Sequence, residues 1–131
     1  MLSLVALNNV VCLRRAYFEE WPWDQDTDRV YAMLACMHEH DSVDRVASGW
    51  PYLSPLNFYR EASQRRSFEF VIDEREATPQ SEIFVIESDL SPAVVKQRNL
   101  TPIWSSKVSP TQIAVPPEQV ERLRKSACVS E

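Results

Sequence analysis

The chain contains a single glycine, Gly49, among its 131 residues. An average glycine content of about 7% would give about nine. Phosphate-binding loops of the dinucleotide-binding and P-loop types need several glycines, because backbone amides must approach the phosphates closely. The sequence therefore excludes a glycine-rich nucleotide-binding loop.

The length of the chain is that of one ordinary domain. Its 131 residues are 44% hydrophobic and 25% charged, which is normal globular content and far from that of disordered chains. We expect residues 1–131 to form one domain with one hydrophobic core.

The charge of the chain bears on its partners. The net charge is -5, whereas proteins that bind duplex DNA or RNA use Lys and Arg to release counterions from phosphates. We therefore expect no direct binding to duplex nucleic acid, and another protein, a basic one, as the partner.

Two further features predict a cytoplasmic location. The apolar start of the chain, residues 1–7, has no preceding basic residue and is interrupted by Asn8 and Asn9, so it is too short for a signal peptide or a membrane span. Cys12, Cys36 and Cys128 show no C-x-x-C spacing and leave an odd cysteine in any disulfide scheme. We expect reduced thiols and no membrane association.

The first half of the chain predicts a β-hairpin, a loop and two helices. The hairpin spans 2–13 around Asn8-Asn9, and an irregular loop follows over 17–28. A helix capped by Asp26 or Thr27 carries apolar residues at helical spacing as far as Val46, and Gly49 ends it, with Trp50-Pro51 as a firm stop. A short helix then runs from Ser54-Pro55 to about residue 65.

The second half predicts strands and shorter helices. Residues 67–73 and 82–88 are rich in Phe, Val and Ile and are expected to pair antiparallel. A helical turn begins at Ser91-Pro92, short strands cover 103–104 and 113–115, and a last helix opens at residues 116–118. The sequence thus predicts an α+β fold with a mostly antiparallel sheet and two to four helices.

The loop over 17–28 is the candidate contact surface. It combines five carboxylates with four aromatic side chains and contains no basic residue. Aromatic residues supply contact area and an acidic rim attracts a basic partner, although Trp21 and Trp23 at the edge of the core would explain the pattern equally simply. The predicted partner-binding residues are Tyr17, Phe18, Glu19, Glu20, Trp21, Trp23, Asp24, Asp26 and Asp28.

These observations favour a small acidic protein-binding module without cofactor, metal or catalytic residues. Bacterial immunity proteins and other compact inhibitors share this general character, as an analogy of class. Its mechanism would be occlusion of a basic partner surface. A structural subunit that self-associates is a further hypothesis.

An enzyme remains the alternative. Arg14 or Arg15 after a strand, with Glu82 or Glu87 on a later strand, would suit a transferase or hydrolase of a nucleotide-like substrate. This arrangement resembles ADP-ribosyltransferase toxins, but the Ser-Thr-Ser signature of that family is missing, so no residue roles are carried over. Ordinary charges at strand ends explain the same residues.

Two other groups receive a structural interpretation. Cys36 and His40 stand at i and i+4 on one helical face, but no second ligand pair with zinc-like spacing follows, so we expect an exposed helical surface and no metal. The tryptophans Trp50 and Trp104 are expected to complete the core.

Overall fold

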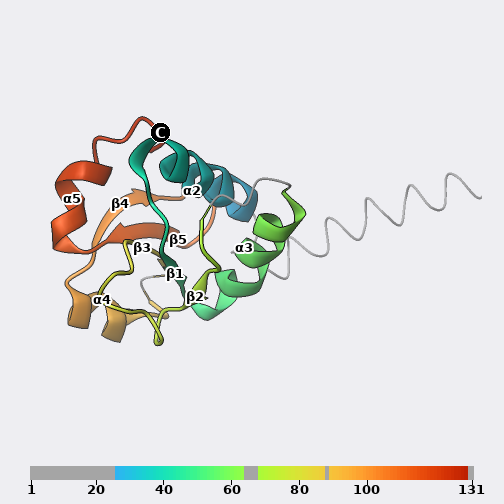
Figure 1. Ribbon diagram of the computed structural model, residues 1–131. Coiled ribbons are helices and arrows are strands. Elements are labelled where there is room, and N and C mark those ends of the chain that lie inside the picture. Colours follow the sequence, from blue (N-terminus) through green and yellow to red (C-terminus); the bar gives the residue numbers. More distant parts are fainter. Residues whose placement is uncertain (1–25, 64–67, 88, 130–131) are drawn as a thin grey trace, which may run out of the picture.

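The computed structural model describes residues 26–63, 68–87 and 89–129. In these residues four helices surround one five-stranded sheet (Figure 1). The elements in chain order are α2 (Thr27–Asp41), β1 (Val46–Ser48), α3 (Trp50–Ala62), β2 (Ile72–Asp73), β3 (Ile83–Glu87), α4 (Pro92–Arg98), β4 (Thr101–Ser105), β5 (Thr111–Val115) and α5 (Pro117–Leu123).

The sheet is mixed, with strand order β2-β1-β3-β5-β4. The short strand β1 runs parallel to both of its neighbours, β2 and β3, whereas β5 runs antiparallel to β3 and β4. Most of the paired residues belong to the two antiparallel ladders. The predicted α+β single domain with a mostly antiparallel sheet is therefore confirmed.

Both faces of the sheet are covered, because alternate residues of each strand point to opposite faces. The larger core lies between the sheet and helices α2 and α3, and includes Val30, Leu34, Leu56 and Val85. The smaller core, on the other face, is built around Phe84 and Ile86, with α4 packed against it. Residues 83–86 of β3 are thus buried on both sides, which fits their continuous apolar sequence.

The prediction of a single helix that ends at Gly49 is wrong for its second half. The helix α2 ends at Asp41, where Ser42 adopts the left-handed conformation (φ 54°) and its N–H bonds to Met37 O. Val46 belongs to the buried strand β1. Trp50-Pro51 does not stop a helix but begins one, because proline is favoured in the first turn, where its missing N–H costs nothing.

The predicted antiparallel pairing of 67–73 with 82–88 is also wrong. β2 covers only Ile72–Asp73, and β1 lies between it and β3. The side chain of Asn57 forms hydrogen bonds of the kind that a neighbouring strand would form. It donates to Val71 O and accepts from Val71 N, both at 2.9 Å. The buried amide therefore holds the segment before β2 against α3.

The later elements confirm the sequence-based predictions. Proline in the first turn opens both α4 and α5, and the strands predicted near 103–104 and 113–115 are β4 and β5. The predicted hairpin over 2–13 lies outside the described residues. None of the helices formed by residues 26–129, as far as they are described, is long and apolar enough to cross a membrane.

Candidate functional site

A pocket of about 240 Å³ opens where the three parallel strands end. Gly49 follows β1, Glu74 follows β2 and Glu87 is the last residue of β3, so the carboxyl ends of these strands meet at one edge of the sheet. The pocket is lined by Gly49, Trp50, Pro51, Glu74, Arg75, Glu87, Leu90 and Ser91.

The strand connections explain why a pocket forms at this edge. After β1 the chain passes through α3 to β2, which lies on one side of β1. The strand β3 lies on the other side of β1, and from β3 the chain continues to β4 and β5. Where connections diverge from neighbouring parallel strands, the carboxyl edge of the sheet is left uncovered, and open sheets often bind ligands there. Its position makes this pocket the candidate functional site.

Gly49 brings the backbone close to two polar groups of the pocket. A Cβ atom at this position would lie 3.4 Å from both Glu74 Oε2 and Ser91 Oγ, at the tight end of normal contact. The amide of Gly49 donates to Val85 O at 2.9 Å and extends the pairing of β1 with β3. The backbone angles of Gly49 (φ -63°, ψ 157°) are open to any residue, and a Cβ atom would meet its neighbours at contact distance, so neither strain nor a clash requires the glycine here.

The carboxylate of Glu74 is buried in the wall of the pocket. Glu74 is only 8% exposed, and Ser91 Oγ lies 2.8 and 2.7 Å from its two oxygens as a hydrogen-bond donor. The helix α3 begins beside it, and the positive end of a helix stabilises a nearby negative charge. Burial of this carboxylate is therefore compensated, and Glu74 is held in one position.

Glu87 is the carboxylate without such compensation. Its Oε2 atom is buried and has no hydrogen-bond partner among the described residues. Burial, and to a smaller extent the negative charge of Asp89, raises the pKa of Glu87. A buried acceptor that lacks a donor costs free energy, so Glu87 would gain from a donor supplied by a bound molecule.

Tyr52 lies on the α3 side of Glu87 and belongs to a buried polar network. Thr111 Oγ1 donates to the hydroxyl of Tyr52 at 3.1 Å, and burial is the main cause that raises the pKa of Tyr52 to about 12. The negative charges of Glu87 and Asp26 add to this shift. Tyr52 therefore stays a neutral phenol within the core.

Two large hydrophobic side chains line the pocket while lying open to solvent. Trp50 is 63% exposed and Leu90 is 59% exposed. Trp104 is buried, as predicted, whereas the prediction of Trp50 in the core is wrong, because the first turn of α3 turns its side chain outward while Tyr52 enters the core. The pocket thus combines carboxylates with exposed apolar surface.

Most of the predicted contact loop lies outside the described residues, namely Tyr17, Phe18, Glu19, Glu20, Trp21, Trp23 and Asp24. Of the other two residues, Asp28 is exposed and Asp26 is 7% exposed. Asp26 accepts hydrogen bonds from Ser106 Oγ and, at 3.0 Å, from Ser109 Oγ. Asp26 therefore joins α2 to the loop between β4 and β5, while the role of the loop as a contact surface stays a prediction.

The glutamates of the enzyme hypothesis lie at opposite ends of β3. Glu82 precedes the strand, accepts from the amides of Asp44 and Arg45, and forms an ion pair with Arg122 at 2.9 Å. Glu87 ends the strand and lines the pocket. One cleft cannot contain both, and Glu82 has a structural role, while Arg14 and Arg15 lie outside the described residues.

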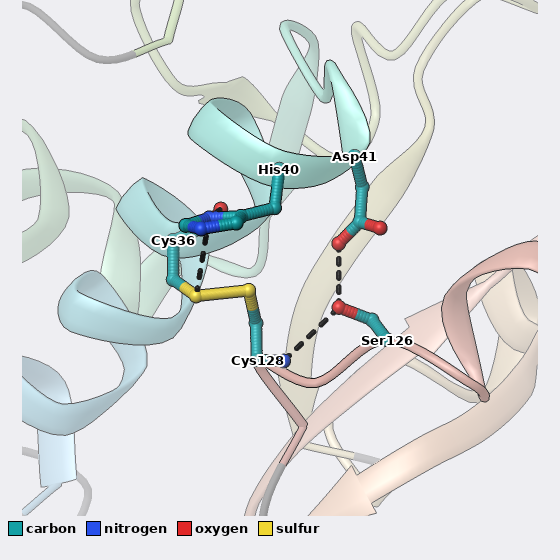
Figure 2. The surroundings of a disulfide bond; sticks show 5 residues. All are labelled: Cys36, His40, Asp41, Ser126 and Cys128. Atoms are coloured by element: carbon teal, nitrogen blue, oxygen red, sulfur yellow. Dashed lines mark hydrogen bonds between the residues drawn. A yellow bond between two sulfur atoms is a disulfide. The ribbon is translucent and has the colours of Figure 1, made fainter.

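The expectation of reduced cysteines is wrong for two of them. Cys36 of α2 and Cys128 of the C-terminal segment form a disulfide across a sequence separation of 92 residues. Figure 2 shows His40 beside this bond, with its Nδ1 atom 3.9 Å from Cys36 Sγ. The i, i+4 spacing placed Cys36 and His40 on one face correctly, but Cys128 had no local signal.

Comparison with protein families, characterised proteins and solved structures found no match to this chain. Any function must therefore be argued from its own residues. No sequence pattern marked Glu74 or Leu90, and Ser91 was predicted only as the start of a helical turn. Gly49 was predicted to end a helix, and nothing in the sequence placed it beside a pocket.

Proposed function

We propose that the chain is a small protein-binding module whose acidic pocket accepts a lysine or arginine side chain of a basic partner. Its mechanism would be occlusion of the partner's basic surface, as in an inhibitor or immunity-type protein. The observation that carries the proposal is the Oε2 atom of Glu87, which lacks a donor among the described residues, beside a pocket lined by the exposed Trp50 and Leu90.

The size of the pocket favours one side chain over a whole ligand. Small-molecule sites usually measure about 300–1,000 Å³, and this pocket measures about 240 Å³. The ammonium or guanidinium group of a long basic side chain would supply the donor that Glu87 lacks. Its aliphatic stem would lie against Trp50 and Leu90.

The charges of the pocket also support a cationic occupant. Glu74 and Glu87 line it, and Asp89 follows β3 closely enough to affect the pKa of Glu87. Arg75 also lines the pocket, but its side chain is exposed and lies 3.7 Å from Asp73 as an ion pair. A bound cation would lower the pKa of Glu87, so affinity should rise with pH while Glu87 loses its proton.

The loop over 17–28 would supply a second contact on the same partner. Within this proposal, replacing Trp21, Trp23 and Asp24 together should weaken partner binding without changing the thermal midpoint. Asp26 must be left intact in that variant, because it accepts hydrogen bonds from two serines beside β4 and β5.

A peptide selection tests the proposal directly, because it does not require the partner to be identified first. Displayed random peptides are selected on the purified protein at moderate salt, and the affinity of the enriched sequences is measured by calorimetry. We expect enrichment of peptides that carry Lys or Arg next to an aromatic or aliphatic residue, and we expect Glu87→Gln and Trp50→Ala each to weaken binding at least about tenfold, a loss near 1.4 kcal/mol.

Glu121→Gln is the matched control. Glu121 lies on α5, is exposed, and pairs with Lys125 at 3.1 Å, away from the pocket. This variant removes the same charge, so it should leave peptide affinity unchanged. Equal losses in both variants would mean that net charge alone drives binding, and the pocket would then have no specific role.

The raised pKa of Glu87 also favours a second function. A carboxylate in a pocket with a pKa above its usual range suits general acid–base chemistry, as the hypothesis of a transferase or hydrolase of a nucleotide-like substrate requires. Thermal shift with nucleotides separates the two functions. A nucleotide that stabilises the chain but not Glu87→Gln would favour the enzyme.

The compartment depends on the redox state of Cys36 and Cys128. Disulfides persist in oxidising compartments and are rare in the cytoplasm, so the bond is more typical of proteins outside the cytoplasm. The cytoplasmic location expected from the sequence requires both thiols to be reduced in the cell. Alkylation of the thiols in freshly lysed source cells distinguishes the two locations.

A further inference from the structure

Three side chains that commonly bind metals meet where the C-terminal segment reaches α2. Cys36 Sγ, His40 Nδ1 or Nε2, and Cys128 Sγ all lie within 4.8 Å of one another. Cys36 and His40 project from the same side of α2, and Cys128 approaches them from the C-terminal segment (Figure 2). The cluster therefore joins residues that are distant in sequence.

The spacing of these atoms is close to that of a zinc site. Tetrahedral zinc with Zn–S bonds near 2.3 Å and Zn–N bonds near 2.0 Å holds its ligand atoms roughly 3.5–3.8 Å apart. Cys36 Sγ and His40 Nδ1 are already 3.9 Å apart. The Sγ atom of Cys128 lies within 4.8 Å of the same histidine, and the two sulfurs would separate once their bond is reduced.

The surroundings favour a cation once the thiols are free. Cys36 and His40 belong to the last two turns of the 15-residue helix α2, and the negative end of a helix dipole attracts positive charge. His40 is exposed, so its ring is accessible to an incoming ion. Its Nδ1 atom also lies 3.1 Å from Cys36 O, and a proton held there would move to Nε2 when Nδ1 binds a metal.

We propose that reduction of the Cys36–Cys128 disulfide converts this cluster into a zinc-binding site formed by Cys36, His40 and Cys128. A dithiol reductant supplies two electrons and two protons, and is itself oxidised to a disulfide, while the protein gains two thiols. Zn²⁺ then displaces the two thiol protons without further redox change, and water completes the coordination. Either cross-link, disulfide or zinc, holds the C-terminal segment against α2.

The contacts around the cluster include hydrogen bonds that do not depend on the disulfide. Ser126 Oγ donates to a carboxylate oxygen of Asp41 at the end of α2 and accepts from the amide of Cys128 at 3.1 Å. These hydrogen bonds do not involve the sulfurs. They would help to hold Cys128 beside α2 once the disulfide is reduced.

The test uses the full chain with Cys12→Ser, so that the pair supplies the only thiols. The reduced protein is titrated with Zn²⁺ under anaerobic conditions against a chromophoric chelator, and with Co²⁺ to detect the visible bands of tetrahedral coordination and the thiolate charge-transfer band. We expect one metal ion per chain, and none in the oxidised protein.

His38→Gln is the matched control for His40→Gln. His38 lies on the same helix, but its Nδ1 atom is 2.8 Å from Asp44 Oδ1 and 2.9 Å from Val43 O, outside the cluster. We expect His40→Gln to weaken zinc binding at least about tenfold, because loss of a residue that only supports a ligand already costs about that much. Cys36→Ser should abolish zinc binding. His38→Gln should bind like the parent.

Each other outcome overturns the proposal. Reduced protein that stays folded and binds no zinc would refute the site, and so would zinc binding that His40→Gln leaves unchanged. If reduction unfolds the chain, refolding on addition of Zn²⁺ supports the site, whereas a chain that stays unfolded with zinc refutes it. Circular dichroism distinguishes these states.

Discussion

Removal of the Cys36–Cys128 disulfide should cost a large part of the stability of the domain. The bond closes a loop across a separation of 92 residues, and loop-closure entropy for a loop of this length corresponds to about 4.6 kcal/mol at 25 °C. Measured values for disulfides are usually about 2–4 kcal/mol. We therefore expect Cys36→Ser with Cys128→Ser to lower the free energy of unfolding by at least about 2 kcal/mol in oxidising buffer.

Urea unfolding followed by circular dichroism measures this difference, with metal chelator present throughout. In reducing buffer the parent should lose most of its advantage over the double variant, because both chains then lack the cross-link. Cys12→Ser is the control and should retain the full dependence on redox conditions. If oxidised and reduced parent protein differ by less than about 0.5 kcal/mol, the assignment of this disulfide as a constraint on the unfolded chain is refuted.

Three further changes test other parts of the structure. Glu87→Gln should stabilise the protein at neutral pH but not below about pH 4. The pKa of Glu87 is raised above its ordinary value of 4.5, so the folded state binds the proton more tightly than the unfolded state and loses stability as the pH rises above 4.5. Urea unfolding at several pH values measures this difference. Asn57→Ala should cost about 2–4 kcal/mol, since it removes both hydrogen bonds to Val71 and leaves buried backbone groups unpaired; the same assay at pH 7 checks it. Because the pKa of Tyr52 rises from 10.0 to about 12, ionisation of this side chain should lower the stability of the parent by about 2 kcal/mol between pH 10 and 12, and Tyr52→Phe, which lacks the ionising group, should lose less over that interval.

The sequence predicted two of the three helices that begin with proline and misinterpreted the third. Pro92 and Pro117 mark the starts of α4 and α5 because the first turn of a helix needs no N–H there. At Trp50-Pro51 the same signal was interpreted as a stop, since the apolar spacing from Val30 to Val46 suggested one continuous helix. Helical spacing cannot reveal that Ser42 takes a left-handed conformation and that a three-residue strand follows.

The pairing of the strands depended on contacts that no local pattern contains. Residues 82–88 were predicted correctly as a strand, but their partner β1 is only three residues long and buried on both faces, so it shows no alternation of polar and apolar residues. Residues 67–73 were therefore assigned as the partner in its place.

The candidate site was hidden for a similar reason. A buried glutamate such as Glu74 looks like a surface glutamate in the sequence, and only the meeting of three strand ends shows its burial. The disulfide partner of Cys128 is also distant in sequence, so no local pattern indicates the bond. Gly49 was predicted only as the end of a helix, and its position beside Glu74 and Ser91 is visible only in the structure.

Gly49 itself provides a probe for the entry of a basic side chain into the pocket. Labelling the chain with ¹⁵N-glycine gives a single backbone amide signal, from Gly49, which donates to Val85 O at the pocket. The measurement is a titration of this signal with an arginine-containing peptide obtained by the selection. We expect a saturable shift in the parent and in Glu121→Gln, and a far weaker response in Glu87→Gln. A peptide that binds without moving the Gly49 signal would place the contact elsewhere and contradict the proposed function.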